Sequence, residues 1–351
     1  MRLVLVTDQL HSPYSGMLPG HIAGLYRRDE MHIDLAGLAR ATGTTLIHAR
    51  AIGIDPDRKI VILHGREPAP YALASINVGI TPDLSAIQGA EQHGIAVKPI
   101  STFLNRFDAM MAGAVAQDGP RHVAIVGNGP AGVELAFALA ANFRRTEANA
   151  RSPGWQITLI GSGEVVQRLN WRARRRVEKA LDRHGVRRIA GARVVSIEPE
   201  AIETAQGQRL PVDATLISTR ARAPRWLAST GLPLGRDGSI STSATLQVIG
   251  RPDIFAVGDC AEIVGEPREK AGVFAVRQGP ALARNIRLAW RGAPLPQHEP
   301  QTHYLVLLMT GDRSAIGARG RWLAVEGRWV WWLKDWIDRR FMTRFTASVL
   351  R

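Results

Sequence analysis

Residues 122–140 read HVAIVGNGPAGVELAFALA, and this stretch decides the fold. An apolar strand runs into a turn of the pattern GxGxxG, and a helix pattern begins directly after it. In such a turn the first glycine permits the bend, the second lets backbone approach a pyrophosphate, and the third lets helix and strand pack closely. The helix start adds N–H donors and a partial positive charge. The sequence therefore predicts a nicotinamide-nucleotide site formed by Gly127, Asn128, Gly129, Pro130, Ala131 and Gly132.

The next strand of this unit, 156–161 (QITLIG), is followed by no carboxylate at its tip. An acid there would bind the adenosine ribose of NAD. Glu164 is the nearest acid, and basic residues follow at Arg168, Arg172 and 174–176. These arginines either suit a 2′-phosphate or form one solvated helix face, so NAD and NADP both stay open.

Alternating strand and helix patterns continue on both sides of this unit, which indicates an α/β fold. Further strands are predicted at 2–7, 60–63, 76–80, 193–197, 214–218 and 254–259, and helices at 33–41, 101–117, 172–184 and 273–290. A polar break with Gly and Pro at 116–120 and a Pro-rich link at 294–300 predict two boundaries.

Composition excludes several classes of protein. The 351 residues are 45% hydrophobic and 22% charged, which is typical of a globular chain. Cys260 is the single cysteine, so neither an internal disulfide nor a thiolate-rich metal site is expected. The net charge of +14 is read as solvated faces, with no specific nucleic-acid partner. No apolar run is long enough for a spanning helix and no signal peptide is evident, which predicts a cytoplasmic protein.

A second motif, DIFAVGDC at 253–260, places an acid after a glycine at the end of a strand, where it can accept hydrogen bonds from a polyol. Here the chain resembles flavoproteins with two dinucleotide-binding domains, in which this motif holds the ribityl chain of FAD. The resemblance implies that Gly258 and Asp259 bind FAD. It also implies two Rossmann-like domains and a short C-terminal α+β region.

Within that superfamily the chain resembles type II NADH dehydrogenases and, more closely, the flavoproteins found beside or fused to selenide, water dikinase. SPYSGMLPG (12–20), the stretch 71–100 and the tail 310–345 carry this likeness. It implies an FAD-dependent NAD(P)H oxidoreductase that passes hydride to flavin and electrons on to a small-molecule or protein acceptor other than an internal disulfide. The alternative is a degenerate nucleotide-binding partner protein without flavin turnover, linked to selenium metabolism.

The same resemblance implies roles for single residues. Residues beside the flavin are Pro13, Tyr14, Ser15, Lys98, Gly272 and Val273. Glu134 matches a glutamate near the meeting point of nicotinamide and flavin, where it either relays a proton or complements the first turn of its helix. Relatives that reduce quinone typically show Ala-Gln where this chain has Gly272 and Val273, which argues against quinone as the acceptor.

The chain departs from its relatives at the start. They begin with a strand, a GxGxxG loop and a helix that hold the FAD pyrophosphate, whereas this chain begins at the strand after them, where Asp8 would meet the ribose of FAD. Either Met1 is an internal methionine, which we favour, or the chain is a truncation that binds FAD poorly. The predicted domains are FAD-binding (1–118 with 236–295, N-terminally incomplete), NAD(P)-binding (119–235) and C-terminal (296–351).

The tail from 329 to 345 predicts an amphipathic helix. Apolar residues recur at helical spacing at Val330, Leu333, Ile337 and Phe341, flanked by Trp332 and Trp336. The basic residues Lys334, Arg339, Arg340 and Arg344 lie elsewhere. Such a helix suits a peripheral contact with the inner face of a membrane. The alternative is that it packs on the FAD domain or on the partner in a homodimer.

Overall fold

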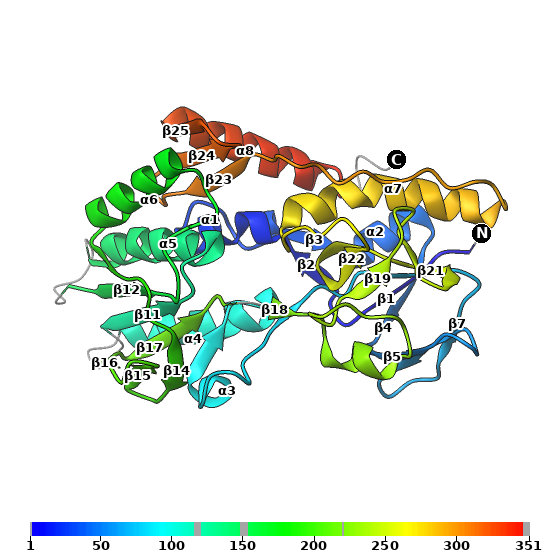
Figure 1. Ribbon diagram of the computed structural model, residues 1–351, viewed down its shortest axis with the longest axis horizontal. Helices are drawn as coiled ribbons and strands as arrows, with labels where there is room; N and C mark the ends of the chain where they lie inside the picture. The colour runs from blue at the N-terminus through cyan, green and yellow to red at the C-terminus, as the bar shows by residue number, and fades with distance from the viewer. Residues whose placement is uncertain (1, 116–120, 148–153, 220, 347–351) are drawn as a thin grey trace.

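The computed structural model describes residues 2–115, 121–147, 154–219 and 221–346. Two halves built on sheets lie side by side, and a layer formed by the C-terminal residues runs across the top of the molecule (Figure 1). The first half contains the glycine turn, and the second contains the DIFAVGDC motif.

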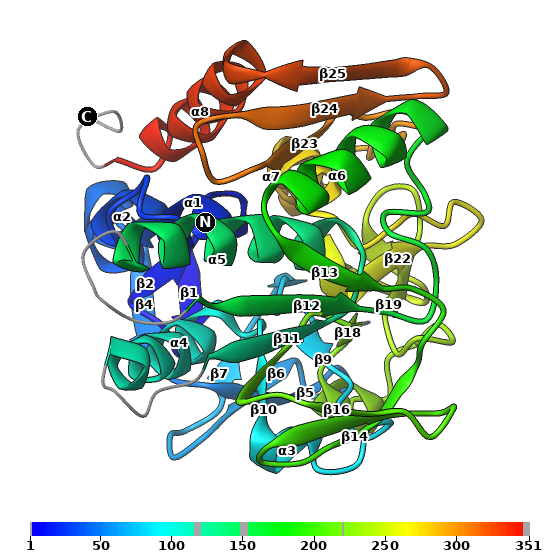
Figure 2. The ribbon, with the colours of Figure 1, turned by 90° about the vertical axis from the view of Figure 1, so that its left-hand side faces the viewer.

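The first half is a five-stranded parallel sheet in the order β10-β17-β11-β12-β13. Its strands are Gly94–Ala96, Ala214–Ile217, His122–Val126, Gln156–Ile160 and Val186–Ile189. Because both faces of the sheet are covered, the central strand β11 is an unbroken buried run from Val123 to Val126. Figure 2 shows α5 (Pro130–Glu147) and α6 (Trp171–Arg183) on one face and β14 and β16 near the other.

Shorter elements complete this half. The three antiparallel strands are Val194–Ile197, Ala201–Thr204 and Arg209–Pro211. The helices α3 and α4 span Ala90–His93 and Ile100–Val115. Large apolar side chains of α5 and the sheet, among them Phe137, Leu139 and Ile125, are fully buried in the main core. Each such side chain contributes about 1.5–3 kcal/mol by leaving water.

The second half contains several small sheets. A parallel pair joins β1 (Val4–Thr7) to β4 (Thr45–His48). A five-stranded sheet has the order β22-β19-β20-β21-β8, with strands Ala261–Ile263, Ile240–Thr242, Gln247–Val248, Arg251–Ala256 and Ala74–Ile76. The remaining strands are β2 His11–Pro13, β3 His32–Asp34, β5 Ala51–Asp55, β6 Ile60–Leu63 and β7 Ala69–Pro70.

Helices of this half flank the strands. They are α1 Leu18–Ile22, α2 Leu35–Thr42 and α7 Gly272–Trp290, with short 3-10 helices at Ser15–Met17, Asp29–Met31, Arg225–Ser229 and Gly258–Cys260. The predicted helix from residue 33 begins at Leu35 instead, because Asp34 caps it by accepting a hydrogen bond from Gly37 N at 2.8 Å.

The C-terminal layer is an antiparallel sheet of β23 (Val306–Met309), β24 (Ala315–Arg319) and β25 (Leu323–Gly327), followed by α8 (Arg328–Thr343). This layer lies over α5 and α6 (Figure 2). The predicted α/β class and the amphipathic tail helix are confirmed. Most of the short strands were missed, β13, β15, β16 and β23–β25 among them, and the predicted strand 76–80 ends at Ile76.

The predicted domain boundaries at 118 and 235 stay a prediction, and contacts among the described residues cross both of them. β10, which was assigned to the first domain, pairs with β17 of the five-stranded parallel sheet through Ile95 and Leu216. Leu227, which was assigned to the nucleotide domain, is buried in the core of the second half. β9 (Thr81–Pro82) pairs with β18 (Ala221–Arg222) between the two halves, and α1 of the second half packs against α5 of the first. The break at 116–120 lies outside the described residues, and the elements on either side of it share one core.

Candidate functional site

The glycine turn between β11 and α5 forms a cradle with one open side. Gly127 has φ of +119°, and a Cβ on it would lie 2.4 Å from the Ser218 carbonyl oxygen. A Cβ on Gly132 would lie 1.8 Å from the Gly127 carbonyl oxygen. At Gly129, by contrast, a Cβ would meet no atom within 4 Å. The first and third glycines are thus required by packing, and the second leaves room for a ligand at the start of α5.

The segment after β12 folds back onto this turn. The side-chain amide of Asn128 donates to the Gly163 carbonyl at 2.5 Å, and the Asn128 carbonyl accepts from Val166 N at 2.9 Å. Pro130 and Ala131 begin α5 on the exposed side of the turn. Of the six residues predicted from the sequence, Gly132 is buried beneath the turn and the other five are at least partly exposed at the helix start.

The DIFAVGDC motif forms a second polar site at the end of β21. Gly258 has φ of +72°, and its N–H donates to the side-chain oxygen of Gln278 on α7 at 2.7 Å. Lys98 Nζ donates to Asp259 Oδ2 at 2.9 Å, although the two residues are far apart in the chain. The structure thus brings together Lys98 and Asp259, which the sequence analysis assigned to the flavin separately. The sequence analysis missed Gln278.

The start of α7 lies beside the loop that contains Pro13, Tyr14 and Ser15. A Cβ on Gly272 would lie 3.8 Å from Ser15 Oγ. Ala271, at the N-cap, supplies no side-chain acceptor to the first turn, so the amides near Gly272 and Val273 receive no cap from it. Such a helix start can accept a carbonyl or an anion. Asp8 lies apart, at the end of β1, in an exposed ion pair with Arg50.

A buried charged cluster joins three distant segments. Glu134 of α5 accepts a hydrogen bond from Met309 N at 2.9 Å. Lys334 of α8 donates to the Gly16 carbonyl and to Asp338, each at 2.8 Å, and the Tyr14 hydroxyl donates to Asp338 at 3.2 Å. Lys334 and Asp338 are buried, and Tyr14 and Glu134 are partly buried. We call these four residues the buried cluster.

The pKa values of the buried cluster follow from its burial. Burial raises the pKa of Glu134 to about 7, against the opposing effect of Lys334. Burial also raises the pKa of Asp338, although Lys334 and Tyr14 oppose it. For Lys334 burial lowers the pKa, but Asp338 and Glu134 outweigh that effect and the pKa is raised. One buried cation therefore faces two carboxyl groups, and Glu134 can take up or release a proton near neutral pH.

The face of α8 that is buried differs from the predicted one. Val330, Lys334 and Asp338 point inward, whereas the predicted apolar residues Leu333 and Ile337 are exposed. The outer face of α8, which we define as Trp329, Trp332, Leu333, Trp336 and Ile337, shows its tryptophans at 54–60% exposure. The sequence analysis separated Lys334 from the apolar face of the helix because a lysine charge is costly to bury. The signal that was overlooked is the four-residue spacing of Val330, Lys334 and Asp338.

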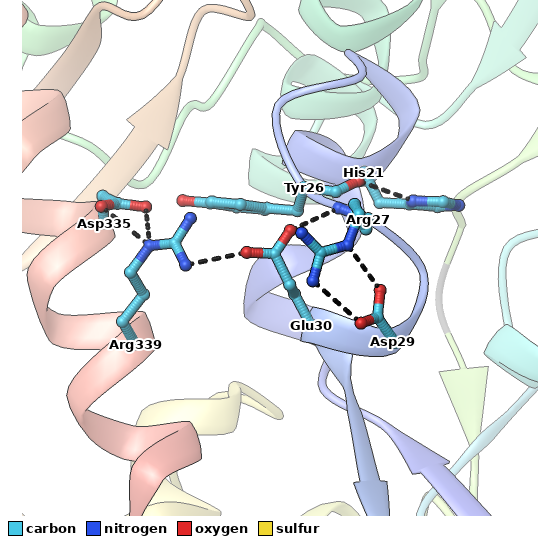
Figure 3. Close-up of polar contacts among 7 residues, drawn as sticks. All are labelled: His21, Tyr26, Arg27, Asp29, Glu30, Asp335 and Arg339. Carbon is cyan, nitrogen blue, oxygen red and sulfur yellow. Dashed lines mark hydrogen bonds and ion pairs between the residues drawn. The ribbon is translucent and has the colours of Figure 1, made fainter.

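A second polar cluster clamps α8 onto the segment 21–30 (Figure 3). Arg339 donates to Glu30 at 2.9 Å and to Asp335 at 2.9 Å, and its guanidinium lies 5.3 Å from the ring centre of Tyr26. Arg27 pairs with Asp29 at the exposed edge.

A cavity of about 510 Å³ adjoins this clamp, between the last turns of α8 and the start of α2. Its lining includes Met17, Ile33, Leu38, Arg339 and Met342. Met17 also ends the 3-10 turn that follows Tyr14, so the cavity adjoins the loop that was predicted to lie beside the flavin.

Comparisons with known proteins identify the family of the chain. Residues 1–286 match the sequence profile of the pyridine nucleotide-disulphide oxidoreductase family. Ferroptosis suppressor protein 1 of Xenopus laevis is 28% identical over 211 residues, which cover 56% of this chain and 53% of that protein. The chain thus spans about half the length of that relative. The narrower likeness to proteins beside selenide, water dikinase stays a prediction.

Solved structures share the fold. The sulfide:quinone oxidoreductase of Aquifex aeolicus has a TM-score of 0.79 at 18% identity, over 98% of this chain and 85% of that chain. NDH2 from Plasmodium falciparum in complex with NADH has a TM-score of 0.83 at 13% identity, over 98% and 92%. Among the described residues, no helix combines the length and apolarity needed to cross a bilayer.

Proposed function

Because the chain belongs to the pyridine nucleotide-disulphide oxidoreductase family, we propose that it is an FAD-dependent NAD(P)H oxidoreductase. The observation that carries the proposal is the glycine cradle, in which packing accounts for Gly127 and Gly132 while Gly129 faces open space. A pyrophosphate would lie over Gly129, with the first amides of α5 as its donors. The nicotinamide nucleotide is assigned to this cradle.

FAD is assigned to the second half. Gly258 and Asp259 would hold the ribityl chain, and the open start of α7 at Gly272 and Val273 would face the pyrimidine end of the flavin. Lys98 orients Asp259 through their ion pair. When bound, the flavin supplies hydride acceptance and electron release. The proposal assigns no residue of this chain to the FAD pyrophosphate.

The buried cluster is proposed to hold the proton that accompanies hydride chemistry. Glu134 follows the glycine cradle by two residues, and Tyr14 and Gly16 belong to the loop beside Ser15. A carboxyl group with a pKa of about 7 is protonated in part of the molecules at neutral pH, as a group that exchanges protons requires.

The electron acceptor is proposed to approach through the cavity beside Met17. Its lining includes Ile33, Leu38 and Met342, which favours a small molecule with an apolar body over a protein. An internal disulfide cannot serve as acceptor, because Cys260 is the single cysteine and is buried.

The test is optical. The purified chain is incubated with FAD, freed of excess by gel filtration, and titrated anaerobically with NADH and with NADPH. A retained flavin band that is bleached by either nucleotide is the expected result. A protein that stays colourless, yet binds nucleotide in calorimetry, would support the degenerate partner protein instead.

The outer face of α8 is proposed to rest on a membrane surface that contains anionic lipid. Three exposed tryptophans lie there beside Leu333 and Ile337, an arrangement that suits the interface between headgroups and acyl chains. The chain carries a net charge of +14, Arg340 lies in the last turn of the helix, and Arg344 is its C-cap residue. Charge complementarity therefore favours a bilayer over a second copy of this basic chain.

Replacing Trp332 and Trp336 together with serine is expected to weaken vesicle binding about tenfold, because each ring would leave the bilayer interface. Co-sedimentation with vesicles of phosphatidylcholine and phosphatidylserine measures it. The matched control is Trp290→Ser on α7, which removes a ring of 51% exposure from another helix. Equal binding by all three proteins, or equal binding to vesicles without phosphatidylserine, contradicts the proposal.

A further inference from the structure

We propose that the nucleotide site prefers a nicotinamide nucleotide with a 2′-phosphate, so that NADPH binds more tightly than NADH. This inference rests on the nucleotide binding proposed above and adds which of the two nucleotides is taken. The segment 161–169, which follows β12, carries it. Three features of that segment matter: its first residue, its carboxylate and its arginine.

The first residue, Gly161, has no side chain to bind a ribose. A carboxylate at this end of the second strand is what binds the adenosine ribose in NAD sites, and its charge would repel a 2′-phosphate. A Cβ on Gly161 would lie 2.4–2.7 Å from the side-chain amide of Asn128. That amide is held in place by its hydrogen bond to the Gly163 carbonyl. The neutral amide of Asn128 thus occupies the space that the side chain of an acid at position 161 would need to reach the ribose.

The nearest carboxylate, Glu164, is already engaged. It forms an ion pair with Arg174 of α6, and the side chain of Arg174 is 28% exposed. The pair compensates the negative charge next to the tip of β12. The repulsion that a 2′-phosphate would otherwise meet is thereby reduced.

Arg168 supplies a cation that can exchange partners. It pairs with Glu269 at 3.0 Å, and its side chain is 69% exposed. Glu269 lies in the segment ahead of α7 and also accepts a hydrogen bond from the Tyr304 hydroxyl at 3.2 Å. Exposed ion pairs are weak, so a phosphate, with a charge of about −1.5 to −2 at neutral pH, can replace the carboxylate on Arg168. Arginine binds such a group through two parallel N–H donors.

The backbone around Arg168 is fixed against the glycine turn. Val166 is 2% exposed and has φ of 40°, a left-handed conformation that is rare for a β-branched residue. Its N–H donates to the Asn128 carbonyl, and Leu169 N donates to the Val166 carbonyl at 2.8 Å. Arg172, the neighbouring arginine, lies instead over the rings of Trp171 and Trp322. The structure thus separates two arginines that the sequence could not rank.

The experiment is calorimetric titration of the full chain with 2′,5′-ADP and with 5′-AMP, two fragments that differ only in the 2′-phosphate. We expect 2′,5′-ADP to bind at least about tenfold more tightly. Arg168→Gln should abolish that preference without changing the affinity for 5′-AMP. Glu269→Gln should increase the affinity for 2′,5′-ADP, because the carboxylate that competes for Arg168 is gone. The matched control Arg172→Gln removes the same charge four residues away and should keep the preference.

The two levels of the proposal fail differently. If the original chain binds the two fragments equally, or binds 5′-AMP more tightly, the preference for the 2′-phosphate is overturned while nucleotide binding stands. A preference that survives Arg168→Gln, or that Arg172→Gln abolishes equally, overturns the role of Arg168. If neither fragment binds and neither NADH nor NADPH binds, the proposed nucleotide site itself is wrong. Because Arg168 is exposed, circular dichroism should show that the variant folds normally.

Discussion

Gly129→Val is expected to remove nucleotide binding while the protein stays as stable as before. The valine side chain would fill the open side of the cradle, where the start of α5 offers its amides. Hydrogen bonds to a charged group contribute about 1.5–3 kcal/mol each, so the loss of one or two weakens binding about 100-fold. Calorimetric titration with NADPH and NADH measures the affinity, and thermal unfolding measures the stability.

Gly132→Ala in the same turn is the contrasting variant. Its Cβ would lie 1.8 Å from the Gly127 carbonyl oxygen, so the turn itself must shift and the unfolding temperature should fall. A Gly129→Val protein with unchanged affinity would mean that the nucleotide binds elsewhere. A Gly129→Val protein that unfolds early would contradict the open space described at that position.

Lys334→Met is expected to destabilise the protein by about 3–5 kcal/mol at about pH 8. Lys334 is 5% exposed and is the cation that faces Asp338 and Glu134. Without it, two carboxyl groups are buried without a cation, which is the costly way to break a buried ion pair. Urea unfolding monitored by circular dichroism gives the free energy of unfolding.

The pH dependence of that loss has a defined sign. Burial raises the pKa of Asp338 and Glu134 in the folded protein above their unfolded values, so the folded state binds more protons than the unfolded state. The free energy of unfolding then falls as pH rises through this range. In the variant this effect is larger, because the opposing Lys334 is gone. The difference from the original protein should therefore shrink as pH falls from about 8 to about 5.5.

The control for this prediction is a second substitution. Lys334→Met combined with Asp338→Leu replaces the pair by apolar groups and should recover most of the lost stability, since such replacements are often neutral. Arg340→Met removes an exposed cation from the same helix and should cost less than about 0.5 kcal/mol. A loss that is independent of pH, or equal for Arg340→Met and Lys334→Met, would falsify the assignment of a buried cluster.

Local rules explain what could be predicted from the sequence. The turn after β11 was identified because glycine conformations and helix starts depend on a few neighbouring residues. The same holds for Gly258, which follows a strand and adopts a positive φ, a conformation that glycine tolerates without steric cost. Domain boundaries were harder, because a polar segment with Gly and Pro marks a loop and does not tell whether the flanking elements share a core. α4 and β11 do share one.

The sequence by itself determined the glycine turn before α5 and the lack of a carboxylate at Gly161, directly after β12, because both depend on consecutive residues. Only the tertiary structure decided that Glu134, Lys334 and Asp338 influence one another electrostatically. It also decided that Arg168 pairs with Glu269, whereas Arg172 lies over the rings of Trp171 and Trp322. The physical reason is that propensity and backbone sterics act within a few residues along the chain. Burial and charge compensation depend instead on which distant segments come into contact, and no local pattern specifies that α8 covers α5.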